Sequence, residues 1–361
     1  MVLWLLVAIG CVQIPPHVFW PAAFGALTLP FALGLNLLLA VYWLLRRWRV
    51  AVLPLLVAAL TWPHFQRGLA LHPSRLAPMA AAPDHEKAVR VLSANVRIFN
   101  VYPQLRDPDL ASSRKLVQWI ADSPADIICL QEFYNEPRGA HTRDGKVFRT
   151  VEQIGENSGR EAFLSKTLTN SAGSEFGMAI FSRFPILQRG TISFGKLTQN
   201  HAMFVDLRLP AGDTIRVFNF HLQSMSMEEK DIVQSYSSKA GFKQKSRGLL
   251  RRYKLGLIRR SLQIDTLVRR FERCRYPMLL CADLNDVPYS YSYDQLADHF
   301  QNAWATVGNG VGSTYNGRLP LVRIDNQFVS SQWTVRDFNV HYEIPYSDHF
   351  PTTAVYELQA R

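Results

Sequence analysis

The sequence predicts an α/β fold, in which one large α/β domain follows an N-terminal membrane-spanning helical region. The first observation is the distribution of charge, because residues 1–83 contain no Asp or Glu and all 29 acidic residues lie from Asp84 onward. The second is that short β-branched or apolar runs alternate with polar segments after this point, as in α/β domains. The remaining roughly 270 residues are enough for one large domain with a full core.

The N-terminal region is apolar enough for several passes through a bilayer. Residues 1–45 contain no charged side chain, and about 20 apolar residues are needed for each pass. We expect a transmembrane region at residues 1–70 with about three helices, in runs 2–14, 24–45 and 50–66. The alternative is a cleaved signal peptide, but the chain lacks the basic segment and the small-residue cleavage site that such peptides carry.

Three arginines predict the orientation of these helices. Arg46, Arg47 and Arg49 lie between the second and third apolar runs, and positive loops usually face the cytoplasm. The third helix then runs outward. We therefore expect a multi-pass membrane protein whose large domain lies on the extracytoplasmic face.

Composition also predicts a linker, the charge of the partners and the state of the cysteines. Residues 71–88 are rich in Pro and small residues, which predicts a linker before a domain at residues 89–361. The net charge of +11 favours phosphate-bearing substrates or an anionic membrane surface. Cys129 and Cys281 lie in apolar runs typical of buried strands, so we predict no disulfide, although pairing of these two remains an alternative.

Several predicted strands end in side chains that bind metal ions or phosphate. These are Asn95, Glu132, His221, Asp283 and Asn285, and two further segments supply Asp325, Asp348 and His349. Each alone has an ordinary structural explanation, such as a turn cap, an ion pair or a core histidine. Together they would make a costly cluster unless a cation neutralised the carboxylates. Oxygen donors without cysteine or spaced histidine pairs favour Mg²⁺ or Mn²⁺, with Glu132 as the first-choice ligand.

The order of the motifs provides a resemblance to a known family. The segments LSANVRIFN, IICLQEF, GMAIFSRFPI, FNFHLQS, CADLNDVP, STYNGRLPLVRIDNQF and YSDHFP occur in this order from about residue 89 to the C-terminus. Each motif is weak alone, but the ordered set resembles the endonuclease/exonuclease/phosphatase superfamily, which has a DNase I-like fold. The resemblance implies a four-layered α/β sandwich with two packed mixed β-sheets and helices outside.

The resemblance also implies roles for individual residues. Glu132 would bind the metal, with Asn95 and Asp348 nearby. His349 would act as the base or as a partner of the transition state, oriented by Asp325. Asp283 and Asn285 would position the nucleophile and the scissile phosphate, and His221 would donate to a phosphate oxygen. Asp283 is the alternative to His349 as the general base. The substrate-binding candidates are Arg183, which could equally form a strand-end ion pair, and Tyr315.

Some positions depart from the family pattern. Arg97 stands where some members have an additional Asp, so one metal ion is favoured over two. Ala282, Leu284 and Asn326 replace residue types that are common at their positions. None of these changes removes a catalytic group, so we expect an active enzyme.

A basic segment separates the His221 and Asp283 motifs. Residues 239–270 carry many Lys and Arg residues, and the second half is expected to be a helix with Arg251, Arg252, Arg259 and Arg260 directed outward or laterally. Its predicted packing stripe is Leu250, Tyr253, Leu257, Leu262 and Leu267. Residues 234–247 are expected to form a loop near the site that contacts phosphates or lipid headgroups.

Three functions remain open from the sequence. The leading hypothesis is a membrane-anchored, Mg²⁺-dependent phosphodiesterase or nuclease that acts on nucleic acid outside the cytoplasm. The second is a phosphodiesterase or phosphatase of lipid headgroups, similar to a sphingomyelinase or an inositol-phosphate phosphatase. The third is a non-catalytic phosphate-binding membrane module, which the complete set of catalytic residue types disfavours. No obligate protein partner is evident.

Overall fold

The structure is a computed structural model that describes residues 1–72, 88–102, 104–105, 107–138, 146–195, 200–224, 239–317 and 319–359. Most of the predicted linker at residues 71–88 therefore lies outside the described residues. The strands begin at Ala88, close to the expected start of the large domain.

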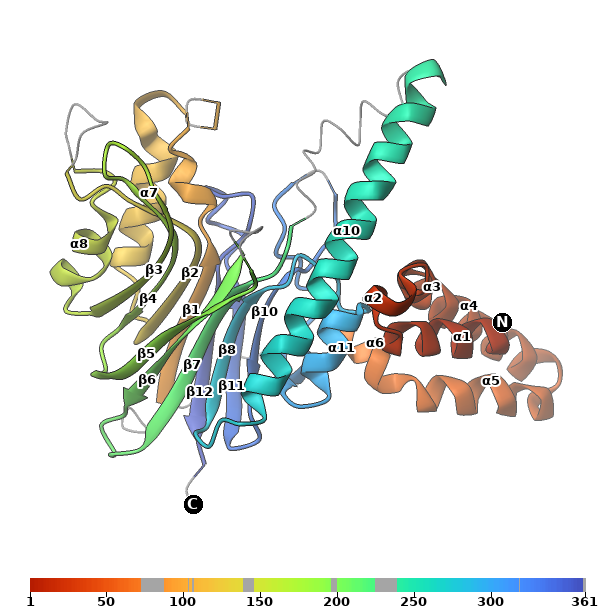
Figure 1. Ribbon diagram of the computed structural model, residues 1–361. Helices are drawn as coiled ribbons and strands as arrows, with labels where there is room; N and C mark the ends of the chain where they lie inside the picture. Colours follow the sequence, from red (N-terminus) through yellow and green to blue (C-terminus); the bar gives the residue numbers. More distant parts are fainter. Residues whose placement is uncertain are drawn as a thin grey trace.

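Two six-stranded mixed sheets form the centre of the large domain (Figure 1). The first has the order β11-β12-β1-β2-β4-β3 and the second the order β5-β6-β7-β8-β10-β9. The strands of the first sheet are β1 (Ala88–Asn95), β2 (Ile127–Asn135), β3 (Glu161–Thr169), β4 (Glu175–Ser182), β11 (Trp333–Val340) and β12 (Thr352–Leu358). Those of the second are β5 (Ile186–Ser193), β6 (His201–Arg208), β7 (Thr214–His221), β8 (Met278–Asp283), β9 (Gln301–Asn302) and β10 (Asp325–Val329).

The sheets pack face to face with helices on their outer faces, which confirms the four-layered α/β sandwich. An apolar core that includes Val91, Cys129, Met203 and Val217 fills the space between the sheets. The outer face of the first sheet is covered by α7 (Ala111–Ala121) and α8 (Thr150–Ile154). The outer face of the second sheet is covered by α10 (Lys239–Phe271) and α11 (Tyr291–Ala297). A short helix, α12 (Ala303–Val307), precedes the loop that leads to β10.

Strand direction decides which residues meet at one edge of the sheets. β1 and β2 are parallel, and so are β7 and β8, so each pair ends at the same edge. β10 runs antiparallel to β8 and starts where β8 ends, with Asp325 opposite Asp283. The carboxyl ends of four strands and the beginning of a fifth therefore deliver polar residues to one edge.

The four cysteines are free in the structure. Cys129 lies in β2 and Cys281 in β8, so the two belong to different sheets and are not on adjacent strands. The two thiols nevertheless interact across the core, and burial together with Cys281 raises the pKa of the Cys129 thiol.

The N-terminal helical region consists of α1 (Val2–Gln13), α2 (Pro16–Phe19), α3 (Ala22–Leu27), α4 (Leu29–Arg46), α5 (Trp48–Leu60) and α6 (Trp62–Gly68). Within the described residues, only α4 is long and apolar enough to cross a membrane. A second span is reached if α5 and α6, which are bent by 57°, are counted as one. α1 has 12 residues and is only about 18 Å long at 1.5 Å per residue. Helix length therefore does not support the expected three-pass arrangement.

This region is packed against the large domain rather than separated from it (Figure 1). The side chain of Arg67 in α6 forms an ion pair with Asp294 in α11, and both side chains are largely buried. The backbone carbonyl of Arg67 accepts a hydrogen bond from Arg323, whose side chain is also buried. Just after α6, Ala70 forms a β-bridge with Gly310, so the chain is attached to the large domain before the predicted linker begins.

Helix α10 corrects the expectation for the basic segment. The chain is already helical from Lys239, although residues 234–247 were expected to form a loop. Residues 234–238 of that segment lie outside the described residues. Lys, Arg, Gln and Ala have high helix propensity, which favours a helix over a loop in this segment. Leu257 and Leu267 are buried as expected, whereas Leu250 and Leu262 are exposed.

Arg260 is also placed differently from the expectation. It is buried because it lies one turn from Leu257 and Ile264 on the packed face of α10. There its Nε donates to Asp286 at 3.0 Å, and its Nη1 donates to the carbonyl of Gln223 at 3.0 Å. The buried guanidinium therefore has partners for its charge and its donors.

The buried Arg67–Asp294 pair generates a prediction for stability. Asp294→Asn leaves the buried guanidinium without its counter-charge, and we expect a loss of about 3 kcal/mol in the free energy of unfolding. The measurement is a denaturant titration of the purified protein. Glu357→Gln is the matched control, since its partner Arg336 is 45% exposed and the loss is expected to stay below about 1 kcal/mol. Equal losses in the two variants would contradict the prediction.

Candidate active site

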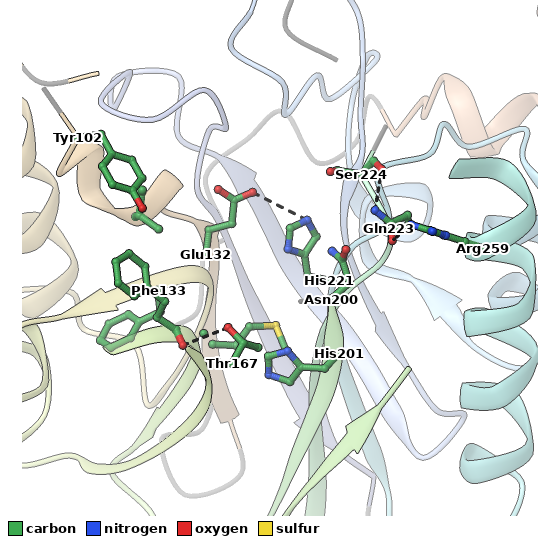
Figure 2. A pocket seen from close by; sticks show the side chains of 14 residues that line it. Tyr102, Glu132, Phe133, Thr167, Asn200, His201, His221, Gln223, Ser224 and Arg259 are labelled. Atoms are coloured by element: carbon green, nitrogen blue, oxygen red, sulfur yellow. Dashed lines mark hydrogen bonds and ion pairs between the residues drawn. The ribbon is translucent and has the colours of Figure 1, made fainter. Parts of the chain in front are cut away.

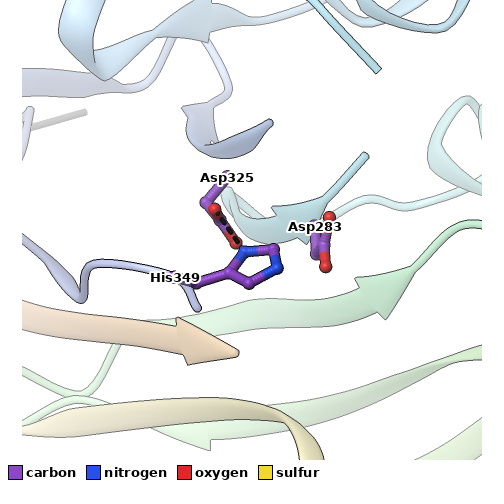
Figure 3. Close-up of side chains that lie close together, drawn as sticks. All are labelled: Asp283, Asp325 and His349. Atoms are coloured by element: carbon purple, nitrogen blue, oxygen red, sulfur yellow. Dashed lines mark hydrogen bonds and ion pairs between the residues drawn. The ribbon is translucent and has the colours of Figure 1, made fainter. Parts of the chain in front are cut away.

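A buried carboxylate–imidazole pair lies at the edge where the strands deliver their polar residues (Figure 3). The ring nitrogen Nδ1 of His349 lies 2.8 Å from Oδ2 of Asp325. The other ring nitrogen points toward Asp283, and ligand atoms of the three residues all lie within 4.8 Å of one another. Thr314 fixes the start of β10, because its hydroxyl accepts hydrogen bonds from the backbone N–H groups of Ile324 and Asp325.

Asp283 is fully buried and held by several donors. Oδ2 accepts a hydrogen bond of 2.9 Å from the amide of Asn95 and lies 3.4 Å from Nε2 of His221. Oδ1 accepts a hydrogen bond of 2.9 Å from the backbone N–H of Asn285. The side-chain amide of Asn285 lies 2.8 Å from Nε2 of His221, so the two residues position each other. A buried carboxylate needs such donors, because desolvation of an isolated charge is costly.

Glu132 stands at the open side of this cluster. Its side chain is 38% exposed, and Oε1 lies 3.2 Å from the Asn95 amide and 3.9 Å from Nε2 of His221. The register of β2 with β4 shifts between Leu130 and Phe133, and Glu132 has a φ of 49° within this irregularity. Asn285 also has a positive φ, of 48°. Non-glycine residues in this conformation are strained, and such strain is concentrated at functional sites.

The charges of the cluster favour a protonated imidazole at position 349. Burial lowers the pKa of His349, but Asp325, Asp283 and Asp348 raise it, and the net result is a pKa well above 6.5. Burial, together with the neighbouring Asp283, raises the pKa of Asp325. Both shifts favour retention of a proton by the Asp325–His349 pair.

Asp348 belongs to the same cluster but is engaged by Arg97. Nε of Arg97 lies 3.2 Å from Oδ2 of Asp348, and the two side chains are 38% and 30% exposed. Arg97 begins a left-handed turn that includes Asn100, in which every residue has a φ between 46° and 53°. The turn is anchored by a hydrogen bond of 2.7 Å from the Asn100 amide to the carbonyl of Tyr346. The Asn95 side-chain oxygen, at 3.0 Å, accepts from the Arg97 backbone N–H.

A cavity of about 520 Å³ opens beside Glu132 and His221 (Figure 2). One wall is largely aromatic, with Tyr102, Phe133 and Phe176. The opposite wall is polar and carries amide, imidazole and guanidinium groups from Asn200, His201, Gln223 and Arg259. Arg259 comes from α10, so this helix forms part of the cavity lining. The volume and the mixed lining are typical of a pocket for a small organic group with polar substituents.

The two residues expected to bind substrate are placed very differently. The ring of Tyr315 makes an edge-on contact with the ring of His349 at a centroid distance of 5.8 Å, which brings it to the site. Arg183 follows β4, whose last residue Ser182 lies opposite Ile127 at the beginning of β2. Because β4 is antiparallel to β2, Arg183 lies at the edge away from Glu132, and the structure corrects its expected place in the site. The other eight expected residues lie at one edge.

Residues that support the site were not singled out from the sequence. Gln131 of the first sheet donates to Asn219 of the second at 2.6 Å, and this buried bond joins the sheets beneath Glu132. The hydroxyl of Ser347 donates to the carbonyl of Asn95 at 2.8 Å and fixes the segment that carries Asp348 and His349. Gln131 and Ser347 each lie directly before an acidic site residue, in the motifs IICLQEF and YSDHFP.

The donor set fits a hard divalent cation. Glu132 and Asp348 offer carboxylate oxygens, and Glu132 is accessible to an ion that keeps some of its water ligands. Asn95 lies beside Glu132, with its side-chain oxygen accepting from the Arg97 backbone N–H. A buried oxygen of Asp325, Oδ1, has no hydrogen-bond partner among the described residues. The alternative group, Asp283, Asp325 and His349, is more closely clustered, but its polar atoms are largely engaged with one another and with Asn95 and Asn285.

Comparison with known proteins assigns the two parts of the chain separately. A family model described as the Endonuclease/Exonuclease/phosphatase family matches residues 92–349. A model of a domain of unknown function matches residues 1–68. No curated protein matches the chain.

Solved structures share the fold of the large domain. An endonuclease/exonuclease/phosphatase from Beutenbergia cavernae has a TM-score of 0.53 and 20% identity, covering 76% of this chain and 72% of its own. One from Bacteroides vulgatus has a TM-score of 0.52 and 17% identity, covering 75% and 99%. The catalytic domain of human nocturnin, with bound sulfate, has a TM-score of 0.51 and 15% identity, covering 75% and 95%.

Proposed function

The chain belongs to the endonuclease/exonuclease/phosphatase family of phosphoester hydrolases, and we propose that it is a divalent-metal-dependent phosphodiesterase or nuclease anchored in a membrane. The observation that carries the proposal is the convergence of Asp283, Asp325 and His349 in one buried group next to Glu132. Burying two carboxylates is costly, and function is the usual reason to retain such a group.

In this proposal Glu132 holds one Mg²⁺ or Mn²⁺, with Asp348 and Asn95 as neighbouring oxygen donors. The bound ion would neutralise charge on the phosphate and increase the acidity of bound water. Arg97, which contacts Asp348, adds positive charge where some family members have another carboxylate. One metal ion is therefore proposed rather than two.

The charges in the cluster support a division of roles between Asp283 and His349. The neighbouring carboxylates raise the pKa of His349 despite its burial, so it is suited to donate a hydrogen bond to a phosphate oxygen rather than to accept a proton. Asp325 orients the ring and stabilises the imidazolium. Asp283 is then proposed as the base that accepts the proton of the attacking water, with Asn285 fixing its carboxylate. His221 contacts both Asp283 and Asn285 and is proposed to donate to a phosphate oxygen as charge develops.

The proposed substrate is a phosphodiester with one group that enters the cavity. Aromatic residues on one wall favour stacking with a base or another planar group, and Arg259 on the other wall favours an anionic substituent. A nucleic acid meets both requirements. A phospholipid headgroup is the competing substrate because the N-terminal helices are packed directly on the domain.

Activity and its metal dependence test the proposed hydrolysis. We expect Mg²⁺ to support hydrolysis of a nucleic acid, or of phospholipid vesicles if the competing substrate is correct, and a chelator to abolish it. His349→Ala is expected to lose about 10²–10³-fold in activity, the usual loss when a donor to developing negative charge is removed, and Glu132→Gln to require far more metal. The measurement is product release with each substrate.

Arg183→Ala is the matched control, since Arg183 lies at the opposite edge of the sheet and full activity should remain. If the purified protein hydrolyses neither substrate nor a generic phosphodiester with any divalent cation, the proposed activity is wrong.

The pH profile tests the assignment of the proton. If protonated His349 is the active form, kcat/KM falls as pH rises through its raised pKa, which lies well above 6.5. Asp325→Asn removes a charge that raises this pKa, so the alkaline fall should move to lower pH. If kcat/KM instead increases through the same pH range, His349 is the base.

We also propose that the N-terminal helical region anchors the chain and that the large domain lies outside the cytoplasm. Arg46, Arg47 and Arg49 lie at the turn between α4 and α5, at the end of the helical region away from the large domain (Figure 1). This position agrees with a cytoplasmic turn under the positive-inside rule.

A fusion to the C-terminus tests this orientation. A reporter that is active only outside the cytoplasm should give a signal, because the C-terminus belongs to the large domain. A cytoplasmic reporter fused at the same residue is the control, and a signal from that reporter alone would reverse the proposed orientation.

A further inference from the structure

We propose that segment 67–72, at the end of the N-terminal helical region, is a positioning element of the active site. It holds the 308–316 loop, and this loop fixes Asp325 and His349 in the geometry that hydrolysis requires. The proposal rests on the roles proposed above for these two residues. It adds a role for the N-terminal region in the chemistry of the large domain, which does not depend on how that region meets a membrane.

Segment 67–72 pairs with the beginning of the loop. The backbone N–H of Ala70 donates to the carbonyl of Gly310 at 3.0 Å, and the N–H of Gly310 donates back at 2.9 Å. The side-chain amide of Asn309 accepts from the backbone N–H of His72 at 2.7 Å and donates to its carbonyl at 3.1 Å. Ala70 is fully buried in the core between the two sheets. The segment is therefore packed as part of the large domain, although it follows directly on α6.

A buried arginine joins the same segment to the loop and to β10. Nη1 of Arg323 donates to the carbonyl of Val311 at 3.2 Å, and Nη2 donates to the carbonyl of Arg67. Arg323 is 1% exposed and lies two residues before Asp325. A buried donor that loses its acceptor is costly. Displacement of segment 67–72 would therefore disturb Arg323 and, through it, the start of β10.

The far end of the loop contacts both members of the Asp325–His349 pair (Figure 3). The hydroxyl of Thr314 accepts from the backbone N–H of Asp325 at 3.0 Å, and its carbonyl accepts from the backbone N–H of Phe350 at 2.7 Å. Tyr315 forms a β-bridge with His349, and the two rings are in edge-on contact. Thr314 and Tyr315 therefore hold together the strand start that carries the carboxylate and the segment that carries the imidazole.

The composition of the loop makes these outside contacts important. Glycine occupies positions 308, 310 and 312, and Gly310 and Gly312 have φ values of 84° and 63°. Glycine loses more conformational freedom on folding than any other residue. The pairing with segment 67–72 offsets this loss at residues 309–310, which lie a few residues before Thr314. The positions of Thr314 and Tyr315 then depend on the segment.

The effect of the segment is expected in turnover rather than in substrate binding. The residues that line the cavity come from other parts of the chain, such as Glu132, Phe133 and Arg259, and not from the 308–316 loop. A displacement of about 1 Å that originates far from the chemistry can reduce the rate about 10²-fold. Loosening of the segment should therefore lower kcat and leave KM nearly unchanged.

Hydrogen exchange and kinetics of the full-length protein test this inference. Asn309→Ala removes both side-chain hydrogen bonds to His72 and leaves every proposed catalytic residue in place. Ser330→Ala is the matched control at the opposite edge of the second sheet. The Ser330 hydroxyl likewise accepts from the backbone N–H of Met278, at 2.9 Å, and donates to its carbonyl, at 3.5 Å. Amide exchange is measured without substrate, and kcat and KM are measured with a soluble phosphodiester.

In Asn309→Ala, the backbone N–H groups of Asn316, Asp325 and Phe350 are expected to exchange about 10-fold faster, the scale of one or two lost hydrogen bonds. We expect kcat to fall by about 10–10²-fold with KM nearly unchanged. Ser330→Ala should accelerate exchange near Met278 only and retain full kcat. The split between kcat and KM separates positioning from a general loss of stability, which would accelerate exchange throughout both sheets.

The inference is overturned if segment 67–72 exchanges faster in Asn309→Ala while residues 314–325 and kcat match the control. Faster exchange at residues 314–325 with full kcat also overturns it, because the loop would then serve stability alone. If Asn309→Ala does not fold, His72→Ala gives the same comparison, since it removes only the 2.8 Å contact with the Gly308 carbonyl. If the unmodified protein hydrolyses nothing, the proposed activity fails, and exchange at residues 314–325 still shows whether the segment holds the loop.

Discussion

The stability of the active-site edge depends on how the negative charge of two buried carboxylates is compensated there. Asp283 and Asp325 are buried opposite each other on neighbouring strands, where two carboxylates repel and lose their hydration. The imidazole of His349 offsets this cost on one side, and Asn95 and Asn285 donate to Asp283 on the other. These partners come from several strands and loops, so the cluster is stable only when the whole edge is assembled.

The arrangement of the strands in the two sheets brings these residues together. Two parallel strand pairs end at the same edge, and β10 begins there because it runs antiparallel to β8. The Gln131–Asn219 bond joins the two sheets just below the site, which fixes Glu132 relative to His221. The strained backbone at Glu132 and Asn285 then directs these side chains toward the cluster.

The N-terminal helical region is structurally connected to this edge. The carbonyl of Arg67 in α6 accepts a hydrogen bond from Arg323, two residues before Asp325. On another side, Ser261 of α10 contacts His17 of α2, while Arg259 of the same helix lines the cavity. The helical region is therefore more than a tether, since two of its contacts lead through short paths to the residues proposed to act on substrate.

The sequence by itself determined the division of the chain, the α/β class and the identities of the polar residues at the strand ends. These follow from local patterns, because charge depletion and alternation of apolar residues are properties of short segments. Tertiary structure decided which residues meet. Arg183 and His349 both lie within motifs of the same family, but strand direction brings His349 to the cluster and places Arg183 at the opposite edge.

Burial in α10 was likewise decided by packing. Arg260 was expected to face outward or laterally, yet it shares a helical face with Leu257 and Ile264. Asp286 and the carbonyl of Gln223 offset the cost of its burial. The proton on His349 depends on three carboxylates that are distant in sequence. Such contacts are set by the closure of the whole fold, so no local pattern in the sequence contains them.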